Sequence, residues 1–157
     1  MLKDASASAQ AQEYFVKAHS AAENNAYDEA IDAYLRGLRF SPDAVEAHAA
    51  LRKVALHRRT HGGENLTELD IAAHSKGATP LDRMLDAEYI LAQQPSHLAS
   101  AEGLLKASIT GGYFKTARWM ADLLFLANKK CKRPSVETYL FLKDTYLTIN
   151  AHSRAIL

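Results

Sequence analysis

The apolar side chains of this chain recur with the period of an α-helix. Between residues 27 and 40 they follow the i, i+3, i+4, i+7 and i+11 spacing of one helical face. Alanine and leucine, both good helix formers, are abundant, whereas glycine, proline and runs of β-branched residues are scarce. The pattern predicts an all-α fold.

Interruptions in the pattern divide the chain into seven helices, with the beginning of an eighth at the C-terminus. A less regular segment, 60–79, leaves room for one short extra helix near 67–74. The main helices are expected over about residues 9–23, 27–40, 44–59, 80–94, 97–110, 113–128 and 134–150.

Several helix ends carry recognisable signals. We expect Asp43 to cap the helix that follows it, with Glu46 as its reciprocal partner. Thr79 should cap the helix that has Pro80 in its first turn, and Ser96 the helix after that. Gly111-Gly112 is expected to form a turn where a helix ends.

Residues 11–42 place aromatic and small side chains at alternating positions along two helices and close with a proline. This stretch resembles one tetratricopeptide repeat, a helix–turn–helix unit of roughly 34 residues. The resemblance implies a right-handed superhelix of stacked antiparallel helix pairs. The residues that carry it are Tyr14, Ala18, Tyr27, Ala30, Tyr34, Gly37 and Pro42.

The rest of the chain resembles the repeat more loosely, and we interpret the whole as one domain of about 3.5 repeats. In the second unit His48 stands where the family has an aromatic residue; in the third, Leu104, Phe114 and Ala117 fit. The expected units cover about residues 11–44, 45–97 with the insertion 60–79, 98–133, and a partial repeat at 134–157. The insertion is expected to cover the groove as a lid, to contact a partner, or simply to be tolerated.

The charge balance excludes a strong general attraction to polyanions. The chain has 19 basic and 18 acidic residues and a formal net charge of +1. We therefore expect no nucleic-acid partner, although a helical-repeat RNA binder remains a third alternative. No apolar stretch approaches the ~20 residues of a membrane span, so no membrane insertion is expected. Without a secretory leader or cysteine pairs, a cytoplasmic location is the default.

No residue pattern indicates chemistry. His57 and His61 have helical spacing for a metal, but Arg58 follows the first histidine where metalloproteases need glutamate. The basic turn from Lys129 to Arg133 lacks interleaved aromatic residues, and the lone Cys131 within it has no neighbouring histidine. We expect neither enzyme activity, nor a cofactor, nor a bound metal.

The family resemblance points instead to protein binding. In this family the first helix of each unit lines a concave groove where peptides or helices of partners dock. The groove residues implied here are Phe15, His19, Lys53, His57, Glu102, Lys106 and Asp144. The leading hypothesis is a protein–protein interaction scaffold. The alternative is an oligomerisation module, because the last helix carries Leu140, Tyr146 and Leu147 with no following helix to cover them.

Overall fold

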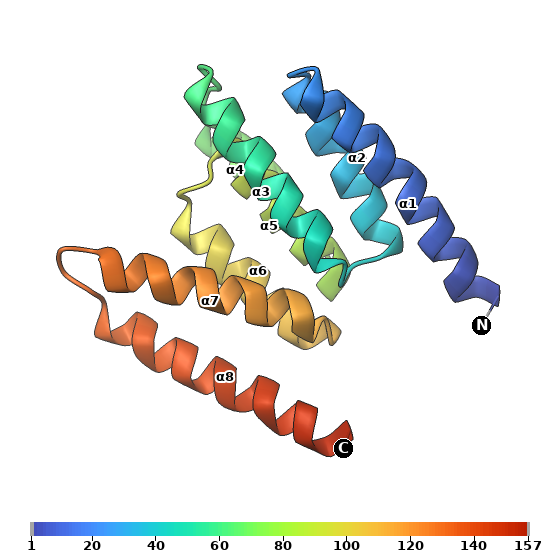
Figure 1. Ribbon diagram of the computed structural model, residues 1–157. Helices are drawn as coiled ribbons and strands as arrows, with labels where there is room; N and C mark the ends of the chain where they lie inside the picture. Colours follow the sequence, from blue (N-terminus) through green and yellow to red (C-terminus); the bar gives the residue numbers. More distant parts are fainter. Residues whose placement is uncertain (1, 157) are drawn as a thin grey trace.

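The computed structural model describes the backbone of residues 2–156 and the side chains of residues 5–152, and this part of the chain is all-helical (Figure 1). The predicted fold class is confirmed at that level. The described helices are α1 (Leu2–Glu23), α2 (Tyr27–Phe40), α3 (Val45–Thr60), α4 (Glu68–Ala73), α5 (Pro80–Gln93), α6 (Leu98–Gly111), α7 (Phe114–Lys130) and α8 (Val136–Ile156).

The helix ends differ from expectation at two places. α1 already begins at Leu2, and α8 continues through Asn150 to Ile156 without a break. The separate helix expected to begin at the C-terminus is therefore not formed in the described residues. His152 belongs to α8 and stacks on Phe114 of α7, with ring centroids 3.9 Å apart.

The capping predictions are confirmed only where the partner is local. Thr79 caps α5 by accepting a hydrogen bond from the Asp82 backbone at 3.0 Å. Gly112 ends α6 in the left-handed conformation, with φ of 80°. By contrast, α3 has no side-chain cap, and α6 is capped by His97 rather than by Ser96.

Helix packing follows the order of the chain. α1 pairs with α2, α2 with α3, α3 with α5, and the sequence continues through α6, α7 and α8. A continuous core lies between these helices because each presents one apolar stripe to its neighbours. The largest fully buried apolar side chains are Ile31, Leu38, Leu51, Met84, Leu104, Leu105 and Leu142.

One contact departs from a regular stack of the expected units. Their first helices, α1, α3 and α6, were expected to line one face together. α6 lies mainly between α5 and α7, as the first helix of the third unit would, but α3 also packs against α7, the second helix of that unit. Figure 1 shows α3 and α7 meeting, with α5 and α6 behind them. This arrangement decides which of the predicted groove residues share a surface.

The insertion packs along the outside of α5. His74, at the end of α4, stacks on Tyr89 with ring centroids 4.0 Å apart. The Gly77 backbone N–H donates to Asp86 at 2.9 Å, and the Arg83 guanidinium donates to the Ala78 carbonyl at 3.0 Å. α5 thus holds the part of the insertion that follows the short helix.

Arg58 joins three segments at one end of α3. Its Nε donates to the Asp28 carboxylate at 3.2 Å, and its Nη1 donates to the backbone carbonyls of Glu64 at 3.1 Å and Gln93 at 3.5 Å. The side chain is only 16% exposed. Arg58 therefore directs its charge to these acceptors rather than into solvent.

Within the described residues, no helix combines the length and apolar character needed to cross a bilayer.

Candidate functional site

The most prominent apolar cleft associated with the predicted groove lies between α1 and α3. It has a volume of about 650 Å³. Tyr34 of α2 contributes to its floor. Its lining residues are His19, Ala22, Glu23, Asn25, Tyr34, Glu46, Ala49, Ala50, Lys53, Val54 and His57.

The cleft has an apolar base and a charged rim. Ala22, Ala50 and Val54 leave space at the base because their side chains are short. Tyr34 is 4% exposed, and burial raises the pKa of its phenol, so the group stays neutral. On the rim, His19 Nε2 lies 3.1 Å from the Glu23 carboxylate. The arrangement suits a ligand with both apolar and polar groups.

Three of the seven predicted groove residues line this cleft: His19, Lys53 and His57. Phe15 does not. Its ring packs across Gly37 of α2, where an added Cβ would lie 2.4 Å from the Phe15 Cε1 atom. The ring also faces Tyr34, with centroids 6.3 Å apart. Phe15 therefore fills the α1–α2 interface instead of projecting as an anchor for a partner.

The other three predicted groove residues lie on α6 and α8, away from the cleft. Lys106 places its Nζ 5.4 Å from the Phe141 ring centroid, which links α6 to α8. Glu102 is half-buried on α6, and Asp144 is exposed on α8. None of Glu102, Lys106 and Asp144 lines the cleft that contains the first three.

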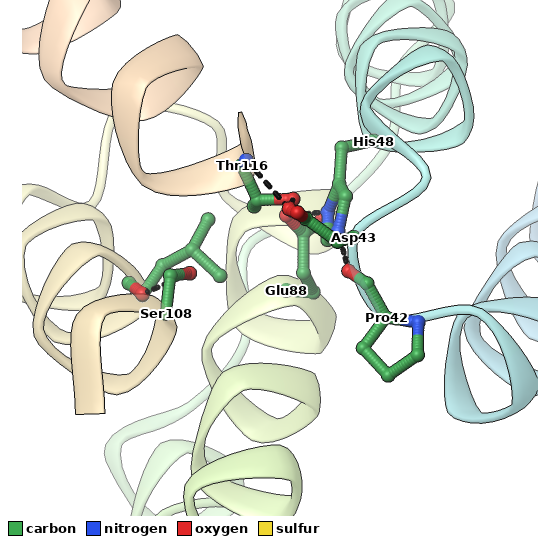
Figure 2. Close-up of polar contacts among 7 residues, drawn as sticks. Pro42, Asp43, His48, Glu88, Ser108 and Thr116 are labelled. Atoms are coloured by element: carbon green, nitrogen blue, oxygen red, sulfur yellow. Dashed lines mark hydrogen bonds and ion pairs between the residues drawn. The ribbon is translucent and has the colours of Figure 1, made fainter. Parts of the chain in front are cut away.

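A buried polar network, shown in Figure 2, joins the α2–α3 turn to α5 and α7. His48 of α3 is fully buried, and its Nδ1 lies 2.9 Å from a Glu88 carboxyl oxygen. Its Nε2 lies 2.8 Å from the Pro42 carbonyl oxygen. Glu88 of α5 is itself only 4% exposed. Every polar atom of the imidazole thus has a partner.

These contacts limit how protons are distributed over the pair. The Pro42 carbonyl only accepts, so His48 Nε2 must donate to it. Nδ1 then either donates to a Glu88 carboxylate or accepts from a Glu88 carboxylic acid. Burial opposes charge on the ring, but the Glu88 charge and hydrogen bond, with the Pro42 bond and Asp43, outweigh it and raise the pKa of His48.

Asp43 lies beside this pair and binds the start of α7. Its Oδ1 accepts hydrogen bonds from both the backbone N–H and the hydroxyl of Thr116, each at 2.8 Å. The Lys115 backbone N–H lies 3.4 Å from Oδ2. Asp43 therefore caps α7 rather than α3. Its negative charge lies at a helix N-terminus, where the helix dipole stabilises it. The predicted Asp43–Glu46 capping box is not formed.

Sequence reasoning did not assign a role to the His48–Glu88 pair. The sequence does contain a signal for the pair: His48 and Glu88 are ionisable residues at positions that the helical pattern predicts to be buried. His48 was noticed only as a poor match to a family aromatic. Its ring does lie near an aromatic residue, Trp119, at 6.0 Å between centroids. The missing information was that α3 and α5 face each other at that level.

Among the described residues, no three histidine, cysteine, aspartate or glutamate side chains converge as metal ligands. His61 directs Nδ1 to the His57 carbonyl oxygen at 2.7 Å, so these two imidazoles do not form a matched ligand pair. The insertion contributes no residue to the lining of the α1–α3 cleft, which argues against a lid there.

Comparisons with protein-family models, with curated proteins and with solved structures found no match for this chain.

Proposed function

We propose that this chain is a tetratricopeptide-like helical-repeat protein that binds a segment of a partner protein in the α1–α3 cleft. The observation that carries the proposal is the cleft itself, an open space of about 650 Å³ with an apolar base and charged rim. The partner segment is a peptide or helix with an apolar side and polar flanks.

The sizes of the lining side chains support this proposal. Ala22, Ala49 and Ala50 keep the base shallow and wide enough for apolar side chains of another molecule. Lys53 and His57 offer donors along one wall, and Glu46 offers an acceptor on the same helix. Polar groups on a largely apolar surface fix the orientation of a ligand without contributing most of its affinity.

Filling the cleft tests the proposal. Ala50→Arg places a long charged side chain on the base, whereas Ala72→Arg makes the same substitution at an exposed position on α4. Proteins captured from cell extract by the wild type and by the Ala72→Arg control should be lost with Ala50→Arg. Hydrogen exchange with the purified partner should then show protection in α1 and α3.

Equal capture by the cleft-filling variant and its control would contradict the proposal. Circular dichroism of both variants is the folding control. Phe15→Ala is unsuitable as a probe, because Phe15 packs against Gly37 and its loss would weaken the α1–α2 interface.

A second candidate function, oligomerisation through α8, is favoured by one observation. Leu140 and Leu147 are 55% and 58% exposed and lie seven residues apart, on the same face of the helix. Tyr146, the third expected member of this patch, instead turns toward α7 and donates to Asp122 at 2.5 Å. Sedimentation velocity over a range of concentrations separates the two functions. A dimer abolished by Leu140→Ser with Leu147→Ser would favour self-association.

A further inference from the structure

The tip of the α7–α8 hairpin combines exposed positive charge with exposed apolar side chains. Four basic side chains, Lys129, Lys130, Lys132 and Arg133, are all exposed there. Large apolar side chains flank them: Phe125 is 39% exposed, Leu126 48%, Val136 70% and Leu140 55%. We call this surface, formed by these eight residues, the hairpin tip.

The exposure of the apolar residues is unexpected from the sequence. The apolar character of residues 114–126 on nearly all sides predicts a helix covered by neighbours all round. Instead α7 buries Met120 and Leu124 and leaves Leu126 facing out. Four of the ten exposed large apolar side chains in the described part of the chain belong to the hairpin tip.

The positive charge of the hairpin tip is not neutralised locally. Among the described residues, none of its four basic side chains forms an ion pair. Glu137 is the single carboxylate between Phe125 and Leu140. The balanced charge of the whole chain therefore hides a local excess of cations at this end.

The backbone of the hairpin tip is held in place. Asn128, 8% exposed, donates from Nδ2 to the Ser135 carbonyl at 2.9 Å and accepts from the Ser135 N–H at 2.8 Å. This pair closes the loop at its base. In Figure 1 the loop between α7 and α8 stands clear of the other helices, at the left of the view. The exposed charged and apolar residues therefore belong to one projecting hairpin.

We propose that the hairpin tip is a docking surface for an anionic lipid membrane. Lysine and arginine side chains near such a surface are attracted by its negative potential. Exposed leucine, valine and phenylalanine gain free energy when they enter the boundary between headgroups and acyl chains. This contact is peripheral and needs no membrane-spanning helix.

The apolar residues favour lipid over nucleic acid. A nucleic-acid surface offers phosphates to the lysines, but it provides no apolar environment in which aliphatic side chains such as Val136 and Leu140 would be buried. Single-stranded nucleic acid would favour aromatic platforms. At the hairpin tip only Phe125 is aromatic, and its ring faces Tyr139 at 5.8 Å between centroids.

Cosedimentation with vesicles tests the proposal. The full chain is mixed with vesicles of phosphatidylcholine alone or with phosphatidylserine added. We expect binding only to the vesicles that contain phosphatidylserine. Replacing Lys129, Lys130 and Lys132 by glutamine should lower the partition coefficient roughly a hundredfold, at about fivefold per cation. The matched control replaces the exposed Lys17, Lys76 and Lys115 by glutamine, which changes the net charge equally.

A second variant separates lipid from a general polyanion. Val136→Ser with Leu140→Ser leaves the charge unchanged and should weaken vesicle binding roughly tenfold. Its binding to a single-stranded oligonucleotide should equal that of the wild type. No wild-type binding to phosphatidylserine vesicles, equal binding by the two lysine variants, or unchanged vesicle binding by the serine variant would each overturn the proposal. The α1–α3 cleft lies on other helices, so its partner test is independent.

Discussion

Asp43 accepts two hydrogen bonds from Thr116, 73 residues further along the chain: one from the Thr116 backbone N–H and one from its hydroxyl. Both carboxylate oxygens of Asp43 face the start of α7. The contact joins the turn after the first helix pair to the last hairpin. Because Thr116 is fully buried and Asp43 is only partly exposed, these hydrogen bonds are not simply exchanged for water.

Asp43→Ala should lower the free energy of unfolding by about 1–2 kcal/mol, because it removes a helix cap and leaves the Thr116 hydroxyl without its acceptor. Urea titration followed by circular dichroism measures the change. The control is Asp32→Ala, which removes an exposed pair with Arg36 and should change stability by less than about 0.5 kcal/mol. Similar losses in both variants would show that Asp43 caps nothing in solution.

The His48–Glu88 pair makes a sharper prediction. Glu88→Ala removes the partner of a fully buried imidazole and should cost about 3–5 kcal/mol. Glu88→Gln keeps an acceptor for Nδ1 and should cost less. The double replacement His48→Phe with Glu88→Met removes both charges while roughly keeping volume, and should recover most of the stability. A double variant as unstable as Glu88→Ala would mean that the pair does not act as a unit.

The same pair predicts a pH dependence. The pKa of His48 is raised in the folded state, so the bound proton stabilises the fold. That contribution is complete below about pH 6.5, the unfolded pKa, and is lost as the pH rises through the folded-state pKa.

Urea midpoints measured from acid to mildly alkaline pH should therefore fall more steeply for the wild type than for His48→Gln. His57→Gln, at an exposed histidine on the same helix, is the control and should parallel the wild type. Parallel curves for His48→Gln and the wild type would contradict the assignment.

Two helical glycines should respond in opposite directions to alanine. At Gly37 the new methyl group would meet the Phe15 ring at 2.4 Å, so Gly37→Ala should destabilise by about 1–3 kcal/mol. At Gly103 an added Cβ meets nothing within 4 Å, so Gly103→Ala should stabilise by about 0.5–1 kcal/mol. Thermal melting of the two variants measures both signs, and a stabilising Gly37→Ala would show that the Phe15 ring moves away freely.

The local features of the fold could be predicted from the sequence. The stripe that contains Ala30, Ile31, Tyr34 and Leu38 is buried as its spacing predicts, because one helix pair is enough to define it. Thr79 caps α5 as predicted, because its partner lies three residues away. Such features depend on contacts within one helix or between neighbours.

The features that failed depend on which side chains meet between helices, and this can fail even between the consecutive helices α1 and α2. Asp43 was assigned to the nearest helix, but α7 lies close enough to compete for its carboxylate. Phe15 was expected to face a partner, but Gly37 leaves a gap that its ring fills. Glu102 and Lys106 were grouped with Lys53 on the assumption of a regular stack, but only Lys53 lines the α1–α3 cleft.

Arg58 shows how the fold can tolerate change at a junction. Two of its three acceptors are main-chain carbonyls, at Glu64 and Gln93, and every amino acid supplies such an oxygen. Replacements at those two positions therefore leave the acceptors in place. Arg58 itself has no such freedom, and neither does Gly63, where any side chain would begin 2.7 Å from the Arg58 Cγ atom. We therefore expect substitutions to be tolerated at Glu64 and Gln93 but not at Arg58 and Gly63.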